Sequence, residues 1–212
     1  MKIAVIGSSG RSGRAFVMAA LAAGHSVTAG TYHAQVAIAA TNRLNIKLCD
    51  ATDLHEVRAL IEGQDAVVSL LGHVRGSAAD VQTRAIRTII KAMQECGMRR
   101  LVSLTGTGVR FPKDNISFAD AVLNTAVKIA DPKRIKDGVR HTELIRRSHL
   151  DWTIIRVMKL QDFSPKPFTL TEHGPGKIIV SRQEVAQAIV QVLEQNSFLQ
   201  QAPIISSVQY KR

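Results

Sequence analysis

Short apolar runs alternate along the sequence with longer segments whose apolar residues recur at helical spacing. The runs occupy residues 2–7, 25–32, 45–50, 65–72, 99–106 and 151–157, and they are rich in valine, isoleucine and leucine. The helical segments occupy residues 12–23, 53–62, 78–96 and 132–148. Strands that are apolar on both faces need helices on both faces, and strand–helix alternation is typical of a parallel sheet. The sequence therefore predicts an α/β fold, with a doubly wound parallel sheet in a three-layer sandwich.

Two regions depart from this alternation. Residues 107–131 form an insert that is longer than a simple connection and has apolar residues of its own. Long connections of this kind commonly form the substrate side or a lid. The tail over residues 160–212 contains short extended pieces, a helix over 182–195 and a last strand over 202–208. Since no linker-like segment interrupts the chain, we expect one domain over residues 1–212, with the insert and the tail on its substrate side.

A glycine-rich loop joins the first strand to the first helix, with Gly7, Gly10 and Gly13 three residues apart. In such loops the first glycine allows a sharp turn, the second a close approach to pyrophosphate, and the third tight helix packing. Free N–H groups at the helix start then bind the phosphates. Because the loop follows a strand and opens a helix, it indicates a dinucleotide site. The predicted binding residues in the loop are Gly7, Ser9, Gly10, Arg11, Ser12 and Gly13.

Arg11 and Arg14 lie at the start of the first predicted helix, where the helix dipole disfavours a cation by about 0.3–1 kcal/mol. A bound phosphate would make both cations favourable, although Arg14 has the alternative of an exposed side chain. A site for NAD places an acidic residue near the end of the second strand, but the first acidic residue of this chain is Asp50. NADP(H) is therefore favoured over NAD(H). The candidates for binding the 2′-phosphate are Thr31, His33, Arg11 and Arg43.

Composition limits the possible partners. The chain has 28 Lys and Arg against 17 Asp and Glu, a formal net charge of +11, and only 4% aromatic residues. Nucleic acid, an anionic membrane surface or a polyanionic small molecule would suit this charge. We expect no nucleic-acid partner because no binding motif is present and few aromatic residues are available for stacking, and the charges also fit a solvated basic face. No apolar run is long enough to span a bilayer, so we expect a cytoplasmic protein with no membrane partner.

The cysteines do not indicate a disulfide, and the histidines do not indicate a metal site. Cys49 and Cys96 form neither a CxxC pair nor a disulfide framework, as is typical of free thiols in a reducing compartment. The histidines have no metal-ligand spacing, so we expect no metal.

Four features together resemble the short-chain dehydrogenase/reductase superfamily: the glycine loop, the DxxD over residues 50–53, the strand DAVVSLLG and the segment HLDWTIIR. The similarity is to its small atypical NAD(P)H-binding members, of the biliverdin reductase B or flavin reductase type and of the NmrA-like type. It extends from Met1 to about Val208 and implies a Rossmann fold. The resemblance places Asp50 and Ala51 beside the adenine, Ser69, Leu70, Leu71 and Gly72 beside the ribose, and Thr105 near the nicotinamide.

The chain departs from that superfamily in its proton donor. Reductases of the superfamily use a Tyr-x-x-x-Lys pair to protonate the substrate oxygen. The tyrosines of this chain, Tyr32 and Tyr210, have no lysine four residues later, and the segment TIIR lacks the proline that usually follows it. Ketone reduction by a tyrosine acid is therefore not expected.

Other residues are weak candidates for chemistry or for the acceptor pocket. His141 is either a proton donor that titrates near neutrality or a polar residue on a helix surface. Thr105 and Thr107 either orient a carbonyl or cap the strand end. The predicted pocket residues are Phe111, Phe118 (alternatively a core residue) and Met158.

Two functions fit these observations. The first is a reductase that passes hydride from NADPH to a small acceptor, namely a flavin, a quinone or a linear tetrapyrrole. Such acceptors need little acid catalysis, because water can supply the proton while the cofactor supplies the chemistry. The second is a non-catalytic sensor that binds NADP(H) and reports redox state to a partner protein, as the NmrA-like resemblance implies. The sequence leaves the oligomeric state open between a monomer and a homodimer.

Overall fold

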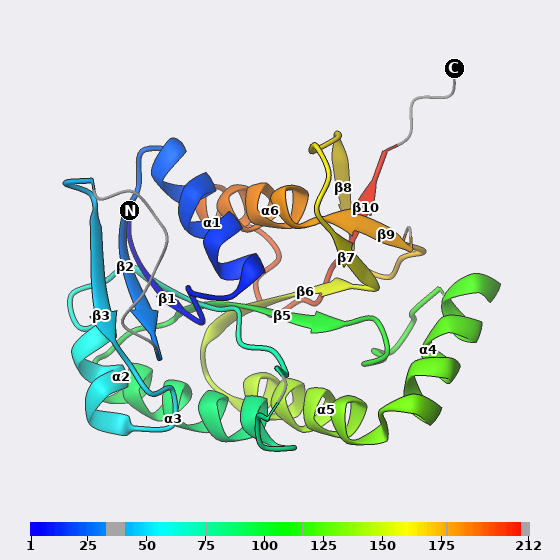
Figure 1. The fold of residues 1–212 in the computed structure, drawn as a ribbon, viewed down its shortest axis with the longest axis horizontal. Helices are drawn as coiled ribbons and strands as arrows, with labels where there is room; N and C mark the ends of the chain where they lie inside the picture. The colour runs from blue at the N-terminus through cyan, green and yellow to red at the C-terminus, as the bar shows by residue number, and fades with distance from the viewer. Residues whose placement is uncertain (33–40, 75, 116, 177, 209–212) are drawn as a thin grey trace.

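The apolar runs of the sequence form the strands of one eight-stranded sheet (Figure 1). The structure is a computed structural model, and it describes residues 1–32, 41–74, 76–115, 117–176 and 178–208. The strand order is β3, β2, β1, β4, β5, β6, β10, β8. The bounds are β1 Lys2–Ile6, β2 Ser26–Thr31, β3 Leu44–Leu48, β4 Ala66–Ser69, β5 Arg100–Gly106, β6 Asp151–Val157, β8 Phe168–Thr171 and β10 Ile204–Ser207. Neighbouring strands are parallel from β3 to β10, which confirms the predicted doubly wound sheet.

Helices cover both faces of the sheet and make the predicted three layers (Figure 1). On one face α1 (Arg11–Ala22) packs against α6 (Arg182–Glu194), and on the other α3 (Val81–Glu95) packs against both α2 (Leu54–Ile61) and α5 (Pro132–Arg147). The helix α4 (Phe118–Ala130) lies in the predicted insert and extends outward beside α5. Over the described ranges, no helix has both the length and the apolar character that crossing a membrane requires.

The central strand β1 explains why both faces of the sheet are covered. Ile3 and Val5 pack into the core beneath α1 and α6, whereas Ala4 and Ile6 pack into the core shared with α2 and α3. All four side chains are buried. Successive side chains of a strand point to opposite faces of the sheet. Because residues 3–6 are all apolar, neither face of β1 is suited to contact with water. The continuous apolar runs of the sequence therefore require two layers of helices.

The tail adds an antiparallel edge that the sequence pattern did not predict. β8 pairs antiparallel with β10, and an antiparallel edge strand on an otherwise parallel sheet is common. The remaining short extended pieces, β7 (Lys159–Gln161) and β9 (Ile179–Ser181), form a separate two-stranded parallel sheet. This small sheet brings the tail over the carboxyl end of β6, beside the start of α6.

Two buried charged groups hold the insert and the tail in place. Arg156 on β6 is fully buried and makes a two-pronged ion pair with Asp114 of the insert, at 2.5 and 2.8 Å, and it also donates to the carbonyl oxygen of Glu172. Glu184 on α6 accepts hydrogen bonds from the backbone N–H groups of Lys166 and Ser181. A buried ion must be paired to be tolerated, so these contacts fix where both regions lie over the sheet.

Candidate functional site

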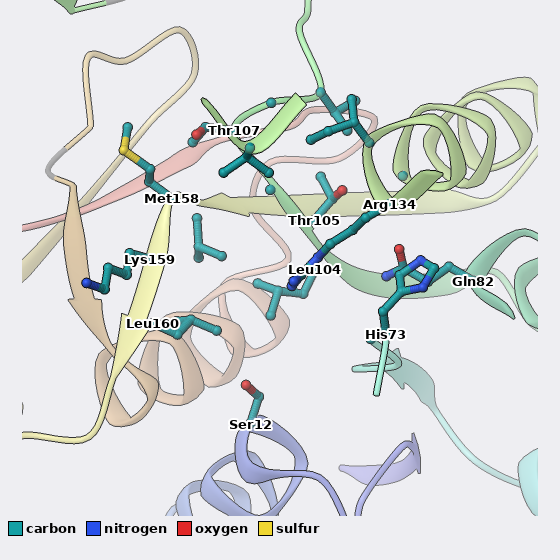
Figure 2. A pocket seen from close by; sticks show the side chains of 18 of the residues that line it. Ser12, His73, Gln82, Leu104, Thr105, Thr107, Arg134, Met158, Lys159 and Leu160 are labelled. Carbon is teal, nitrogen blue, oxygen red and sulfur yellow. The ribbon is translucent and has the colours of Figure 1, made fainter. Parts of the chain in front are cut away.

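A cavity of about 610 Å³ lies at the carboxyl ends of β1, β4, β5 and β6 (Figure 2). Its lining comes from the start of α1, the loop after β4, the segments after β5 and β6, one side of α4, the first turns of α5 and the tail. Of the predicted site residues, those that line it are Gly10, Arg11, Ser12, Leu70, Leu71, Gly72, Thr105, Thr107 and Met158. Those that do not are Gly7, Ser9, Gly13, Thr31, Asp50, Ala51, Phe111, Phe118 and His141. His33 lies outside the described residues.

The three loop glycines have distinct geometric roles. Gly7 has a φ of +85°, and a Cβ there would lie 3.1 Å from backbone atoms of Leu70 and Leu71. A Cβ on Gly13 would lie 2.1 Å from the carbonyl oxygen of Gly7, so the helix can approach the loop only without a side chain. Gly10 lines the cavity, and a Cβ there would contact only the carbonyl oxygen of Gly7, at 3.3 Å. The loop is thus packed tightly behind Gly10 and open in front of it.

The start of α1 has no capping group of its own. Its N-cap is Gly10, which has no side chain that could accept a hydrogen bond from the backbone. The first turn of α1 contains no acidic residue. Among the described residues nothing accepts the N–H groups of Arg11, Ser12 and Gly13. By contrast, α6 starts with a complete capping box between Ser181 and Glu184. Free N–H groups and the positive end of the helix dipole make the α1 terminus an anion site, and the cradle fits the pyrophosphate of a dinucleotide.

The arginine that the sequence placed at this terminus is paired with the tail. Arg11 lies 3.8 Å from a carboxylate oxygen of Asp162, and Arg182 donates to the other oxygen at 2.8 Å. Arg11 and Arg182 are the first residues of α1 and α6, and both line the cavity. A single exposed carboxylate is therefore shared by the cations at two helix starts and offsets one of their two positive charges, where the dipole alone disfavours them.

The predicted adenosine side lies along the ends of β2 and β3. The N–H of Cys49 donates to the carbonyl oxygen of Thr31 at 2.8 Å, which brings Asp50 and Ala51 to the carboxyl edge beside β2. The carboxylate of Asp50 accepts both the N–H and the hydroxyl of Thr52. Burial and the nearby carboxylates of Glu56, Asp50 and Asp53 raise the pKa of Cys49 to about 12, so this thiol stays protonated.

Arg43 is at the wrong edge of the sheet for the 2′-phosphate. A Cβ on Gly24 would lie 3.5 Å from the Arg43 guanidinium, and Gly24 precedes the amino end of β2. Since Leu44 pairs with Val27 at the start of both strands, Arg43 is separated from Thr31 by the length of β2. Of the described candidates, Arg11 and Thr31 remain at the carboxyl edge.

The two candidate threonines differ in what their hydroxyls can do. The Thr107 hydroxyl donates to Asp120 at 3.0 Å and accepts from Asn124 at 3.1 Å, so it is fully engaged. The Thr105 hydroxyl has no hydrogen-bond partner among the described residues, and the residue lines the cavity while being only 6% exposed. Thr105 therefore has a free donor and acceptor for a bound ring, whereas Thr107 braces the insert.

His141 is not the surface residue that helix position suggested. It is 2% exposed and lies beneath β5, where its Nε2 is 3.1 Å from the hydroxyl of Ser103. Burial lowers the pKa of His141 to about 4, against the opposing effect of the Asp137 carboxylate. A histidine that is neutral at pH 7 and does not line the cavity has no proton to give there. The surface assignment failed because α5 turns this residue toward the sheet.

The structure does not bring the predicted phenylalanines to the cavity. Phe118 is 86% exposed at the start of α4, so it neither lines the cavity nor packs in the core, its alternative role. Phe111 packs against the core beneath the sheet, and its ring faces the guanidinium groups of Arg146 and Arg156 at 5.2 and 4.7 Å from the centroid. The insert instead contributes Leu123, Asn124 and Val127 to the cavity wall.

Sequence reasoning missed a polar group on this wall, built from His73, Gln82 and Asp137. Nε2 of His73 lies 2.9 Å from a carboxylate oxygen of Asp137. The same carboxylate accepts the backbone N–H groups of Gln82 and Thr83, both at 3.0 Å, so it caps the start of α3 from another helix. Figure 2 shows His73 and Gln82 together on one side of the cavity. The available signal was the position of His73, directly after the glycine that ends the β4 segment.

The cavity is electrostatically one-sided. Its lining cations are Arg11, Arg134, Lys159 and Arg182, and no Asp or Glu belongs to its described lining. Figure 2 shows Arg134 reaching toward the middle of the cavity, whereas the exposed Lys159 lies at its edge with its nitrogen directed outward. Within the described part of the chain, no group of His, Cys, Asp and Glu residues is arranged to hold a metal ion. A cavity with this charge favours a ligand with several negative charges.

Comparisons with known proteins agree with this geometry. A family model described as NAD(P)H-binding matches residues 7–196. A short-chain dehydrogenase/reductase from Veillonella parvula, solved in complex with NADP, is 16% identical, with 97% of this chain and 94% of that chain covered and a TM-score of 0.82. The anaerobillin reductase ChuY from Escherichia coli O157:H7 is 20% identical over 100% of both chains, with a TM-score of 0.80. A candidate epimerase from Bacteroides thetaiotaomicron is 23% identical over 100% of this chain and 99% of that chain, with a TM-score of 0.84.

At these identities the solved structures establish the fold, which is the Rossmann fold that the resemblance implied. The match to the family model covers most of the chain and includes the glycine loop, the cavity wall and α6. The uncapped α1 terminus supplies the physical reason for a nicotinamide dinucleotide to bind here. The protein is therefore a member of the NAD(P)H-binding family.

Proposed function

We propose that the protein is an NADPH-dependent reductase of a small, conjugated, anionic acceptor of the flavin, quinone or tetrapyrrole type. The observation that carries this proposal is the shape of the cavity, which joins the open α1 terminus to a wall with cations and without carboxylates among its described residues. A volume of about 610 Å³ is within the range of cavities that take a cofactor end or a drug-sized ligand. The reductase neighbours are in keeping with this class of activity.

On the cofactor side, the loop residues bind and orient the nucleotide. The N–H groups of Arg11, Ser12 and Gly13 would hold the pyrophosphate, with Gly10 leaving room for its approach. When bound, the cofactor supplies a hydride. Thr105, at the end of β5, offers its free hydroxyl to a ring bound in the same cavity. Leu70, Leu104 and Val157 give the cavity an apolar floor that excludes water from that ring.

We further propose that NADP(H) binds more tightly than NAD(H). The support is that no acidic residue precedes Asp50 and that the exposed Arg11 lies at the helix start. A charge-assisted hydrogen bond contributes about 1.5–3 kcal/mol, which corresponds to at least a tenfold preference. Calorimetric titration with NADPH and NADH checks the difference. Equal affinities, or a preference for NADH, would contradict this assignment.

On the acceptor side, Arg134 and Lys159 favour an acceptor with carboxylate or phosphate groups. Neither cation has an ion-pair partner among the described residues, so their charges are available to a ligand. Flavin mononucleotide and linear tetrapyrroles have such groups, and ChuY is described as an anaerobillin reductase. We therefore expect these acceptors to have lower KM values than a neutral quinone, with the difference reduced in Arg134→Gln.

The experiment that tests the proposal is NADPH consumption with a panel of flavins, quinones and tetrapyrroles, using Tyr32→Phe and Tyr210→Phe beside the unmutated protein. Tyr32 is 69% exposed and does not line the cavity, and Tyr210 lies outside the described residues. Turnover should remain nearly unchanged in both variants, whereas loss of a general acid costs about 10²–10⁴-fold. Loss of turnover in either variant, with cofactor still bound, would make the mechanism wrong.

One observation favours the alternative of an NADP(H)-binding sensor. Phe118, Val122 and Ile129 are exposed on α4, whose other side lines the cavity. An exposed apolar helix face of this kind suits a partner protein. A protein that binds NADPH and reduces nothing in the acceptor panel would place the sensor ahead of the reductase.

A further inference from the structure

We propose that His73 is the proton donor to the acceptor and that Asp137 is the residue that positions it. The inference rests on the proposed reductase function and assigns the proton that the function requires. Neither residue belongs to the Tyr-x-x-x-Lys arrangement, and neither was a candidate in the sequence analysis. Four observations support this assignment: the enclosure of one ring nitrogen, the fixation of the carboxylate, the position of the pair in the cavity and the unsuitability of His141.

The two nitrogens of His73 have different surroundings. Nε2 is enclosed by protein and lies 2.9 Å from Oδ2 of Asp137, which is an ion-pair distance, although the contact does not have the geometry of a hydrogen bond. Nδ1 has no hydrogen-bond partner among the described residues and is not an enclosed atom, so it is the nitrogen left for the cavity that His73 lines. A fixed carboxylate this close to one imidazole nitrogen restricts the orientation of the ring and leaves the other nitrogen toward the cavity. The side chain is 15% exposed, enough for the ring to exchange its proton with water.

Asp137 is held in place so that it cannot turn away. Its side chain is 1% exposed, and it accepts from the N–H groups of Gln82 and Thr83 at the start of α3. The Thr83 hydroxyl adds a third bond of 2.5 Å. All these donors are neutral, and among the described residues His73 is the ionisable side chain that a contact places at ion-pair distance from this carboxylate. This is the arrangement that orients and stabilises an imidazolium in other acid–base sites.

The pair lies close to the end of β5, where the acceptor ring is expected. Gly138 follows Asp137, and a Cβ there would lie 3.4 Å from the hydroxyl of Thr105. The charged group in contact with His73 is Asp137 on α5, while the cations Arg11, Arg134, Lys159 and Arg182 line the same cavity. α3 presents Gln82 and Thr83 to the pair, and its exposed Asp80 precedes the first turn. Asp137 is thus the only carboxylate that a described contact places on the ring.

The other histidine near Asp137 does not compete for the proton. His141 lies one turn further along α5 and is almost completely buried, so it stays neutral.

The proposed reduction transfers one hydride and one proton to the acceptor. The acceptor takes both electrons with the hydride of the reduced nicotinamide, which is oxidised. A conjugated oxygen or nitrogen of the acceptor forms a bond to the proton that leaves Nδ1, and the neutral imidazole recovers a proton from water.

The decisive variant is His73→Gln, because its amide can still donate to Asp137 and preserve the start of α3. With the best acceptor of the panel, kcat should fall by about 10²–10⁴-fold while the Kd for NADPH changes less than about twofold. The pH profile of kcat should differ between the unmutated protein and the variant, because a glutamine amide cannot gain and lose a proton as an imidazole does. His55→Gln, an exposed histidine on α2, is the matched control and should retain both kcat and the profile.

Two further measurements separate chemistry from structure. Imidazole added to His73→Ala should restore part of the turnover, which a merely structural role would not allow. In the protein without cofactor, imidazole nitrogen NMR shifts should show that a singly protonated His73 ring has its proton on Nε2, so that Nδ1 is the nitrogen that gains and loses a proton. Asp137→Asn should change the ring nitrogen shifts of His73 in the same spectra, because the carboxylate no longer faces Nε2.

The outcomes distinguish this inference from the proposed function. Unchanged kcat and an unchanged pH profile in His73→Gln, together with normal turnover in the unmutated protein, would overturn the role of His73 and leave the reductase standing. An unmutated protein that binds NADPH and reduces no acceptor would overturn both. A neutral tautomer with its proton on Nδ1 would contradict the positioning role of Asp137.

Discussion

The burial and the chemical role of a residue in this protein depend mainly on whether its side chain faces the sheet or the cavity. His141 and His73 are both near Asp137, but His141 is enclosed beneath β5 whereas His73 lines the cavity. Position in the sequence did not distinguish them, since a histidine in a polar helix segment looks exposed. The difference between a neutral packing residue and a candidate acid therefore comes from helix rotation, which is set by the apolar side chains around it.

The buried His141 should make the protein less stable in acid. Its pKa is lowered from 6.5 to about 4 in the folded state, so between these values the unfolded chain binds the proton more readily. The free energy of unfolding should therefore fall as the pH drops from 6.5 toward 4. Urea denaturation at pH 7.5 and at pH 5.0 measures the change in the free energy of unfolding. This free energy should fall by about 1–2 kcal/mol more in the unmutated protein than in His141→Gln.

The exposed His55 provides the control for this measurement. His55→Gln should lose as much stability between the two pH values as the unmutated protein does. If His141→Gln also shows the full loss, the buried imidazole does not carry the acid sensitivity.

At the level of elements, the contrast between the two helix starts is the informative feature. α6 is closed by its capping box, whereas α1 begins at a glycine that leaves its N–H groups open. A glycine N-cap forgoes a few tenths of a kcal/mol of stability relative to Ser, Thr, Asn or Asp. That cost is understandable where a phosphate completes the helix start.

Gly10→Asp should accordingly separate stability from binding. The backbone of Gly10 has φ −68° and ψ 162°, which any residue adopts, and a Cβ there meets only the Gly7 carbonyl oxygen at 3.3 Å. An aspartate would cap α1 and maintain or raise the melting temperature, yet it would abolish NADPH binding by occupying the anion site and repelling the phosphate. Calorimetry and thermal denaturation measure the two effects.

Gly10→Asn is the matched neutral variant for that experiment. It caps the helix without a charge, so NADPH binding should weaken less than in Gly10→Asp. Equal binding by Gly10→Asp and the unmutated protein would show that the phosphates do not lie at the α1 terminus.

The sequence predicted those elements whose residues interact with near neighbours in the chain. The strand at residues 2–7 and the glycine loop were predictable because their pattern is local and their glycines have single geometric uses. β8 was not, since its antiparallel pairing with β10 joins residues about 35 positions apart and depends on the free edge. The pair of His73 and Asp137 was equally hidden, because a contact between the β4 loop and α5 leaves no periodic signal.

For the whole molecule, the contact between the loop and the tail should affect cofactor affinity. Asp162 is shared by Arg11 and Arg182, so a phosphate must compete with it for Arg11. Asp162→Asn should therefore bind NADPH a few-fold more tightly, with a small effect because the pair of Arg11 and Asp162 is mostly exposed. Glu62→Gln, an exposed carboxylate on the far side of α2, is the control and should leave the Kd unchanged. Weaker binding by Asp162→Asn would contradict competition.

The shared carboxylate turns nucleotide uptake into an ion exchange within the protein. The chain carries its own counterion for the phosphate site, so binding replaces one anion by another instead of adding charge to a bare cationic surface. Dissolved salt then has less to screen. Because four cations line the cavity and Asp162 offsets only one of their charges, the affinity for NADPH should still fall as the ionic strength rises, and removing Asp162 should make that dependence steeper.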